Sequence, residues 1–481
     1  MYMTGALPVV ETTMKRRSIM MASRCWKLAG LWVLTLIGAS MAASAPADRI
    51  VVLISVDGFA SCYLDDPRAH MPTIRRLARE GASAGRMEVP LPSVTWPCHT
   101  TLATGTYPAK HGVIGNSYWD REAAKAVPFI PDPLFDKDEI VRVPTIYDIA
   151  HRAGFKTAGI CWPASRNAKT LDWTVPDIFD DGLFRKYSTP SLLEELREAA
   201  IPYEMQMTWC KAAGGGVPRD WMYARIADLI IRKHRPGLLL LHFVEADHVQ
   251  HASGPKSPEA YWVCSHSDDR VRDVVEACDA AFPGRATIIV VGDHGFIPYT
   301  RTIQPNVLLR QQGLLTVEGN QVTARQATVL GQGGASFLYA LDKARRQEIL
   351  DKITPLLRGL EGIDQVITEA DFPRHGLITA DRDPRMADLV ITAKEGYSFS
   401  DTATGDAVVS PPGQSTKGSH GHSPSQPLMG AAFVAWGAGI ESGARVPQIR
   451  SVDVAPTIAS LLGVKMEGAD GRAIEGILAK D

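Results

Sequence analysis

Three aliphatic segments, each followed by an acidic residue, constrain the fold of this chain most strongly. They are residues 50–56 (IVVLISV) before Asp57, residues 237–244 (GLLLLHFV) before Asp247, and residues 286–291 (ATIIVV) before Asp293. Continuous aliphatic and β-branched runs of this length are typical of parallel strands that are buried on both faces. Because the carboxyl ends of parallel strands meet at one edge of the sheet, where open α/β folds bind ligands, we expect the three acids to converge there.

Helical patterns lie between these strands, at residues 72–80, 144–153, 220–234 and 453–462. The alternation predicts an α/β fold with a doubly wound sheet flanked by helices. Residues 299–379 differ, with polar runs, a glycine-rich stretch at 331–334 and one helical pattern. We therefore predict a catalytic domain formed by residues 46–298 and 380–481, with 299–379 as an inserted, cap-like region.

The beginning of the chain has the pattern of a secretory signal peptide. A basic stretch at 14–27 is followed by an apolar run at 28–40 and then by small residues. This order predicts a signal peptide over residues 1–45 and an exported protein, periplasmic or secreted, that meets the membrane only through its export signal. An uncleaved anchor is the alternative, although the apolar run is shorter than the roughly 20 residues that span a bilayer.

Charge and cysteine spacing exclude two kinds of site. The chain has 51 Lys and Arg against 53 Asp and Glu, which argues against nucleic-acid binding driven by bulk charge. The six cysteines after Cys25 form no CxxC pair, so a cysteine zinc site is not expected. A disulfide between Cys264 and Cys278, or buried free thiols, both remain open.

Acid and histidine pairs recur beside glycines and strand ends. The candidate ligands are Asp57, Asp247, His251, Asp293, His294 and His420. Mixed carboxylate and imidazole ligands suit zinc, and also manganese or iron. A single such residue is more often a helix cap or a hydrogen-bonded side chain, but the recurrence favours a metal centre with enough ligands for two ions.

A hydroxyl nucleophile is expected near this centre. Residues 92–105 read PSVTWPCHTTLATG, and Pro97 favours a helix with Thr95 at its N-cap, where the positive end of the helix dipole favours an ionised oxygen. A plain capping threonine is the alternative, and Ser93, Thr100 and Thr101 are rival nucleophiles by residue type.

Five ordered blocks of the sequence resemble the nucleotide pyrophosphatase/phosphodiesterases of the alkaline phosphatase superfamily. The blocks are ISVDGF at 54–59, PSVTWPCHTTLATGTYP at 92–108 with HGVIGN at 111–116, the Asp247-x-x-x-His251 pair, GDHG at 292–295, and GSHG at 418–421. The resemblance covers residues 50–298 and 417–462, and it implies an alkaline phosphatase-like fold.

The resemblance also implies a site with two Zn²⁺ ions. Asp57, Thr95, Asp293 and His294 would hold one ion, and Asp247, His251 and His420 the other. Thr95 would attack phosphorus and form a phosphothreonine intermediate. Asn116 and the backbone amide after Thr95 would contact a phosphoryl oxygen.

The sequence departs from the family pattern at two places. Cys98 stands where the family often has Asn, and the turn at 245–251 reads EADHVQH. His248 therefore competes with His251 as a ligand, although the family's ligand spacing is kept and favours His251. His422 likewise competes with His420, which is favoured because it lies between Ser and Gly as the family's ligand does.

The substrate prediction rests on residues 161–169. Trp162, in a CWPAS stretch that resembles a family segment, either stacks a nucleobase or lies in the core. The predicted activity is hydrolysis of phosphodiester or pyrophosphate bonds in small, nucleotide-type substrates. A phosphomonoesterase or phosphonate hydrolase is the alternative, with Arg166 and Lys169 as candidate partners for the extra charge, and a non-enzymatic binding protein is a third possibility.

Overall fold

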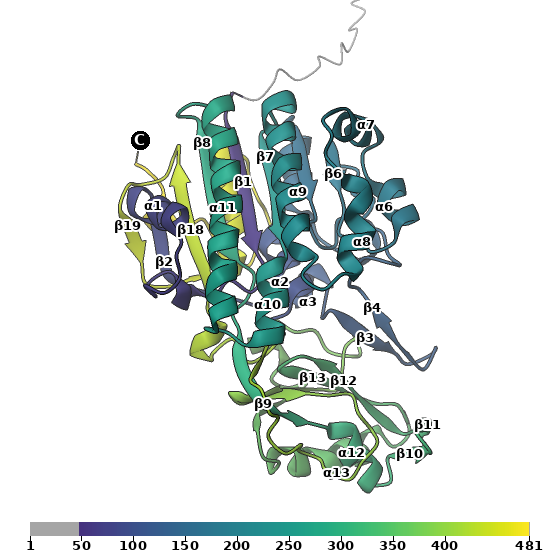
Figure 1. The fold of residues 1–481 in the computed structure, drawn as a ribbon. Helices are drawn as coiled ribbons and strands as arrows, with labels where there is room; N and C mark the ends of the chain where they lie inside the picture. Colours follow the sequence, from purple (N-terminus) through teal and green to yellow (C-terminus); the bar gives the residue numbers. More distant parts are fainter. Residues whose placement is uncertain (1–47, 481) are drawn as a thin grey trace, which may run out of the picture. The chain divides into compact units, whose positions relative to one another are not determined.

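A nine-stranded sheet forms the centre of the protein (Figure 1). The computed structural model describes residues 48–480, so the signal peptide predicted at 1–45 lies outside the described residues. The strand order is β19-β2-β18-β8-β1-β7-β5-β6, with β20 beside β2. The strands are β1 (Ile50–Val56), β2 (Ala82–Glu88), β5 (Thr157–Ile160), β6 (Trp173–Val175), β7 (Leu238–Phe243), β8 (Ala286–Gly292), β18 (Ala431–Gly437), β19 (Ala444–Val446) and β20 (Ile449–Arg450).

The aliphatic run of β1 is explained by its place in the middle of the sheet. β1 pairs in parallel with β7 on one side and with β8 on the other. Val52 and Ile54 belong to one buried apolar cluster, whereas Val51 and Leu53 belong to a second cluster. Because side chains alternate between the two faces of a strand, both faces of β1 are covered, as predicted. One strand departs from the parallel pattern, since β18 runs antiparallel to both β8 and β2.

Helices cover both faces of the sheet, and Figure 1 shows α9 and α11 together on one of them. The helices of this part are α1 (Pro72–Glu80), α2 (Thr95–Thr104), α3 (Pro108–His111), α4 (Lys137–Ile140), α5 (Ile146–Arg152), α6 (Asp181–Tyr187), α7 (Pro190–Glu198), α8 (Gln206–Lys211), α9 (Gly216–Leu229), α10 (Glu245–Ser253), α11 (Pro258–Ala281) and α14 (Val454–Leu462). The helix predicted at 220–234 corresponds to α9 and a π-helical segment at Ile230–His234. None of the helices within residues 48–480 has the length and apolar character needed to cross a membrane.

The inserted region builds sheets of its own. Its elements are β9 (Ile297–Ile303), α12 (Pro305–Gln311), β10 (Leu315–Glu318), β11 (Gln321–Arg325), β12 (Ala327–Gln332), β13 (Ala335–Ala340), α13 (Arg346–Arg358), β14 (Ile363–Thr368), β15 (Leu389–Ala393), β16 (Gly396–Phe399) and β17 (Lys417–Ser419). β15 pairs with both β13 and β14 in a four-stranded antiparallel sheet. β16 and β17 both pair with β9. β15, which follows the boundary predicted at residue 379, is an inner strand of this sheet.

The cysteine pair considered from the sequence is excluded by helix geometry. Cys264 and Cys278 lie on the same helix, α11. Fourteen residues of α-helix span about 21 Å, far beyond the roughly 7 Å at which two Cα atoms can be bridged. The six cysteines of the described residues are free thiols.

His111, in the HGVIGN block, has a structural role in this fold. Its Nδ1 accepts a hydrogen bond from the Val113 amide at 3.2 Å, and its Nε2 lies 3.1 Å from the Thr101 hydroxyl. Burial lowers the pKa of His111 to about 3. The neutral ring is therefore the native form, with Nε2 carrying the proton.

The His111 environment predicts a pH-dependent stability. Because the folded-state pKa lies below the usual value of about 6.5, the stabilisation is complete above that pH and is lost as the pH falls toward 3. Between pH 7.5 and pH 5, this residue should account for a loss of about 2 kcal/mol in the free energy of unfolding. Urea unfolding of wild type and His111→Asn at both pH values measures it. The variant should start less stable and lose less on acidification; equal losses would refute the assignment.

Candidate active site

The three predicted acids meet at the carboxyl edge of the sheet. Asp57 follows β1 and Asp293 follows β8, while Asp247 lies in the first turn of α10, which begins two residues after β7. Since β8, β1 and β7 are neighbouring parallel strands, their ends coincide. The convergence expected from the sequence is therefore present.

Asp57, Asp293 and His294 form one group of potential metal ligands. His294 Nε2 lies 3.4 Å from Asp57 Oδ1 and 3.2 Å from Asp293 Oδ2. The other oxygen of Asp293 accepts hydrogen bonds from the Gly58 and His294 amides, both at 2.9 Å. These amides fix the carboxylate so that Oδ2 faces the group.

Asp247, His294 and His420 form the second group, so His294 belongs to both groups, and His251 lies next to Asp247. Asp247 Oδ1 lies 3.4 Å from Nε2 of His251, one turn later on α10, and 3.4 Å from Nε2 of His420. His420 comes from the segment after β17, which packs closely on α10: a Cβ at Gly418 would lie 2.3 Å from the Gln250 carbonyl oxygen. The ring of His294 stacks on that of His420 with centroids 3.8 Å apart, so the two groups adjoin.

Backbone carbonyls orient all three imidazoles. Nδ1 of His251 lies 3.0 Å from Gly418 O, Nδ1 of His420 lies 3.3 Å from Ser93 O, and Nδ1 of His294 lies 3.2 Å from Gly295 O. A carbonyl can only accept, so each Nδ1 donates its proton and each Nε2 presents a lone pair to the groups. This is the arrangement that metal-binding histidines usually have.

Four buried atoms of these groups have no hydrogen-bond partner, namely Asp57 Oδ1, Asp247 Oδ1, Asp293 Oδ2 and His294 Nε2. Burial, with the adjacent Asp57 carboxylate, raises the pKa of Asp293 to about 8. Burial, with the Asp247 carboxylate, also raises the pKa of Asp57 well above its ordinary value. Buried carboxylates that face one another without a donor are costly unless a cation lies between them.

The rival histidines are used elsewhere. His248 Nδ1 lies 3.5 Å from the Glu245 carboxylate, and the His248 side chain is about half exposed. His422 Nε2 lies 2.9 Å from the Tyr397 carbonyl oxygen. The geometry thus places His251 and His420, rather than His248 and His422, next to Asp247.

Thr95 lies beside the first group at the start of α2. His99 Nδ1 is 2.8 Å from Thr95 O and 3.5 Å from Asp293 Oδ2, which links the start of the helix to the acids. Thr95 is the first helical residue and Val94 is the N-cap, so the predicted cap position is one residue too late. The Thr95 side chain therefore does not serve as the cap.

The rival hydroxyls are all engaged. Ser93 Oγ donates to His422 O at 2.7 Å, Thr100 Oγ1 donates to Trp96 O at 2.8 Å, and Thr101 Oγ1 pairs with His111 Nε2. None of the side-chain hydrogen bonds within residues 48–480 involves the Thr95 hydroxyl. Among the candidates, Thr95 is the residue whose hydroxyl is available.

Asn116 lies next to the start of α2, and nearly all of its polar groups are occupied. Its side-chain Oδ1 accepts a hydrogen bond from the Trp96 backbone amide at 3.0 Å, and its own backbone amide donates to Gln332 Oε1 at 2.9 Å. Its backbone carbonyl accepts a hydrogen bond from the Phe129 amide at 2.9 Å. The Trp96 amide, expected to contact a phosphoryl oxygen, is thus bonded to Asn116. Only the Nδ2 protons of Asn116 remain without a protein partner.

Comparisons with known proteins identify the family of this chain. Residues 51–423 match the model of the type I phosphodiesterase/nucleotide pyrophosphatase family. The chain belongs to this family. Its resemblance to nucleotide pyrophosphatase/phosphodiesterases, inferred from the sequence, is confirmed, and the family is hydrolytic.

Two relatives show how far the similarity extends. An uncharacterized pyrophosphatase/phosphodiesterase of Schizosaccharomyces pombe is 27% identical over 52% of this chain, but the match spans only 45% of the yeast protein. Ectonucleotide pyrophosphatase/phosphodiesterase family member 7 of Mus musculus is 24% identical over 89% of this chain and 87% of its own length.

Solved structures share the fold. Human ectonucleotide pyrophosphatase/phosphodiesterase 5 superposes with a TM-score of 0.67 at 18% identity, covering 90% of this chain and 100% of that one. An inactive variant of the murine protein 5, in complex with AMP, gives a TM-score of 0.66 at 17% identity, with the same coverage. The predicted alkaline phosphatase-like fold is confirmed.

Three residues that were considered for substrate binding make contacts within the protein itself. Trp162 is only 1% exposed and packs edge-on against His99, with centroids 5.0 Å apart, so the structure favours its core alternative over nucleobase stacking. Arg166 donates to Asp136 at 3.0 Å and to the Tyr187 hydroxyl at 2.8 Å. Lys169 donates to Asn167 at an exposed position.

A third group also has the spacing of metal ligands but already contains a cation. Cys161, Asp177 and His242 are buried together. The Arg219 guanidinium, itself buried, lies 3.9 Å from Cys161 Sγ and 3.6 Å from an Asp177 oxygen. This guanidinium supplies the positive charge that the Asp177 carboxylate needs, so we assign no metal ion there.

Two residues that contact the predicted site, His242 and Gln332, were not predicted from the sequence. His242 Nε2 lies 3.0 Å from the Asp57 oxygen that faces away from His294, and His242 Nδ1 lies 3.1 Å from Cys161 O. The sequence feature that could have identified His242 is an imidazole within the otherwise apolar run of β7. Gln332 carried no signal beyond its place before two glycines.

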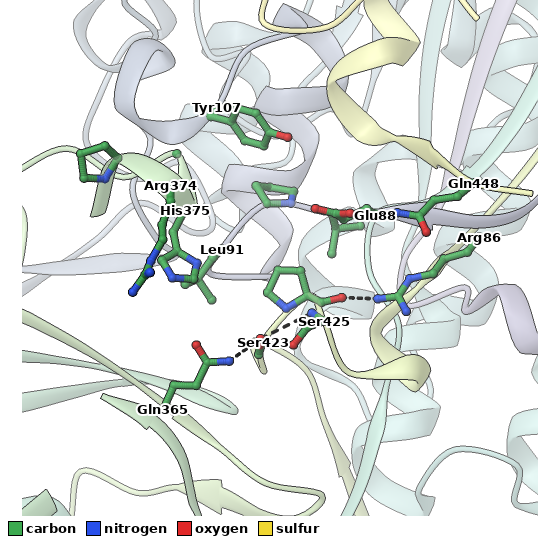
Figure 2. A pocket seen from close by; sticks show the side chains of 15 residues that line it. Arg86, Glu88, Leu91, Tyr107, Gln365, Arg374, His375, Ser423, Ser425 and Gln448 are labelled. Carbon is green, nitrogen blue, oxygen red and sulfur yellow. Dashed lines mark hydrogen bonds between the residues drawn. The ribbon is translucent and has the colours of Figure 1, made fainter. Parts of the chain in front are cut away.

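A cavity of about 460 Å³ lies apart from these groups (Figure 2). Its lining includes Arg86, Tyr107, Gln365 and Arg374, and it contains none of the predicted site residues. Arg86 is turned toward the carbonyl oxygens of Pro424 and Gln426. The size of a cavity alone therefore does not identify the candidate active site of this protein.

Proposed function

We propose that this protein is a zinc-dependent hydrolase of phosphodiester or pyrophosphate bonds in nucleotide-type substrates, with Thr95 as the nucleophile. The observation that carries the proposal is the set of unpartnered, inward-facing ligand atoms at the sheet edge beside a free threonine hydroxyl. Family membership supports the reaction class.

The ligand spacing fits zinc. Tetrahedral zinc holds nitrogen and oxygen ligands at about 2.0–2.1 Å, which places neighbouring ligand atoms about 3.3–3.4 Å apart. The four donor separations measured here are 3.2, 3.4, 3.4 and 3.4 Å. Asp57, Asp293 and His294, with Thr95, would hold one ion, and Asp247, His251 and His420 the other. When bound, the ions would supply the positive charge that activates oxygen nucleophiles and stabilises a leaving oxygen.

Thr95 begins the reaction by attack on phosphorus. Its position in the first turn of α2 places Oγ1 at the positive end of the helix dipole, which favours loss of the hydroxyl proton. The new Oγ1–P bond forms as the bond to the leaving oxygen breaks, giving a phosphorylated threonine that keeps the rest of the diester. Attack by water then cleaves the Oγ1–P bond and releases a phosphomonoester.

Asn116 stabilises the negative charge that the non-bridging phosphoryl oxygens carry in the transition state. Its Oδ1 is held by the Trp96 amide, so its two Nδ2 protons are left to donate to a non-bridging phosphoryl oxygen. A donor fixed before the reaction starts is worth about 2.7–4 kcal/mol of transition-state stabilisation in comparable sites.

The charge balance favours a diester over a monoester. A phosphomonoester carries an additional negative charge, which needs a cationic partner. Arg166, the candidate for that role, is bonded to Asp136 and Tyr187. A nucleotide substrate is further supported by the AMP complex of the murine relative. The N-terminal signal pattern supports action outside the cytoplasm, in the periplasm or after secretion.

A substrate panel tests the proposal. We expect kcat/KM for the p-nitrophenyl ester of thymidine monophosphate to exceed that for p-nitrophenyl phosphate by at least about 30-fold, the factor that corresponds to one uncompensated charge contact of about 2 kcal/mol. Phosphonoacetate serves as the third substrate. A preference for the monoester or for phosphonoacetate would replace the diesterase assignment with one of the alternatives.

A further inference from the structure

One hairpin turn of the inserted region lies between two parts of the proposed site. The turn joins β12 to β13 at residues 332–335. The Gln332 side chain is only 3% exposed, and its Oε1 accepts a hydrogen bond from the Asn116 backbone amide at 2.9 Å. Its Nε2 donates to the carbonyl oxygen and to the hydroxyl of Ser117, both at 3.1 Å. The Gln332 amide group thus holds both sides of the Asn116–Ser117 peptide.

The next residues of the same turn hold the His420 segment. The Gly334 amide donates to His420 O at 2.6 Å. The approach is close enough to exclude side chains, since a Cβ at Gly333 would lie 2.3 Å from His420 O and a Cβ at Gly421 would lie 2.0 Å from Gln332 O. The turn is therefore fixed against the core, and Gln332 cannot move away from Asn116 independently.

We propose that Gln332 is a positioning residue for phosphoryl transfer, acting through Asn116. This inference rests on the proposed function, because it needs Asn116 Nδ2 as the donor to the phosphoryl oxygen. Asn116 is anchored by Trp96 at its side chain and by Gln332 at its backbone amide, and these two bonds together set the direction of Nδ2. Part of the catalytic machinery is thereby supplied by the inserted region.

The test is a double-mutant cycle with Gln332→Met and Asn116→Ala. Methionine keeps the length of glutamine and loses all three hydrogen bonds of its side chain. Gln365→Met is the matched control: Gln365 lies in β14 of the same inserted sheet and donates to Ser423 Oγ at 3.3 Å, near the cavity of Figure 2 and away from Asn116. The readouts are kcat, KM, melting temperature and bound zinc per chain.

Gln332→Met should lower kcat on the nucleotide diester by about 10- to 100-fold, the range seen when supporting residues of a site are removed. KM should stay within threefold of the wild-type value, and the zinc content should be unchanged. The control variant Gln365→Met should behave as wild type. Asn116→Ala should lose about 10²- to 10³-fold, and Gln332→Met should then add no further loss. If the Met variant melts below the assay temperature, Gln332→Ser, which admits water to the Asn116 amide, takes its place.

Two results would overturn the inference: a Gln332 variant as active as the Gln365 variant, or losses that multiply in the double variant. Either result leaves the proposed function intact, provided that the kcat of Asn116→Ala is lowered. A fully active Asn116→Ala variant would instead remove the role given to Asn116 in the proposed function, so the two failures are distinguishable.

Discussion

Thr95→Ala is expected to reduce kcat on a nucleotide phosphodiester by about 10⁴-fold or more, the scale at which removal of a catalytic nucleophile acts in other hydrolases. The reason is that the Thr95 hydroxyl is available beside the acid and histidine groups, whereas the hydroxyls of Ser93, Thr100 and Thr101 are engaged. Stopped-flow or steady-state release of p-nitrophenol measures the loss. Zinc content should fall little, because Asp57, Asp293 and His294 remain.

Two variants control this prediction. Thr95→Ser keeps a hydroxyl at the same position and should retain a measurable fraction of the activity. Thr100→Ala, also buried in α2, removes only the bond to Trp96 O and should leave kcat within about threefold of wild type. Turnover by Thr95→Ala at a rate near that of Thr100→Ala would show that another group attacks phosphorus.

Asp293→Asn is expected to cost about 10³-fold in kcat and to lower bound zinc from two ions per chain to about one, since a lost cationic charge in the transition state is worth several kcal/mol. Asp293 Oδ2 is buried, has no hydrogen-bond partner and lies 3.2 Å from His294 Nε2. An amide at this position matches the carboxylate in shape but lacks its charge. Elemental analysis of the purified variant, together with its kinetics, gives both quantities.

Cys161→Ser is the matched control for metal content. Cys161 belongs to the buried group with Asp177 and His242, which has ligand spacing but already includes the Arg219 guanidinium. This variant should keep two zinc ions. Loss of an ion from Cys161→Ser, or two ions retained by Asp293→Asn, would contradict the assignment of the metal groups.

The elements that the sequence predicts well are those fixed by local pattern. β1 has the predicted bounds because a strand buried on both faces must be apolar at every position. The acids at the ends of β1 and β8, and Asp247 just after β7, follow from the shared edge of parallel strands. Thr95 and His420 needed the family motifs, since residue type alone left Ser93 and His422 as alternatives.

The features that escaped prediction depend on contacts between distant segments. β15 pairs with β13 and β14 across the boundary predicted at residue 379, and this pairing leaves no local signature in the sequence. The sequence left Trp162 open between nucleobase stacking and the core, because its packing against His99 is set by tertiary structure. The same holds for the bond between Arg166 and Asp136. The contact between Gln332 and Asn116 spans 216 residues of sequence and could not be inferred from either segment.

The stereochemical course at phosphorus tests the central claim most directly. Hydrolysis of a nucleotide diester with a phosphorus atom made chiral by sulfur and oxygen isotopes, using the unmodified enzyme, reports the number of displacements. Attack by Thr95 followed by attack by water comprises two inversions, so we expect net retention of configuration. Net inversion would show that water attacks phosphorus directly and would contradict a threonine intermediate.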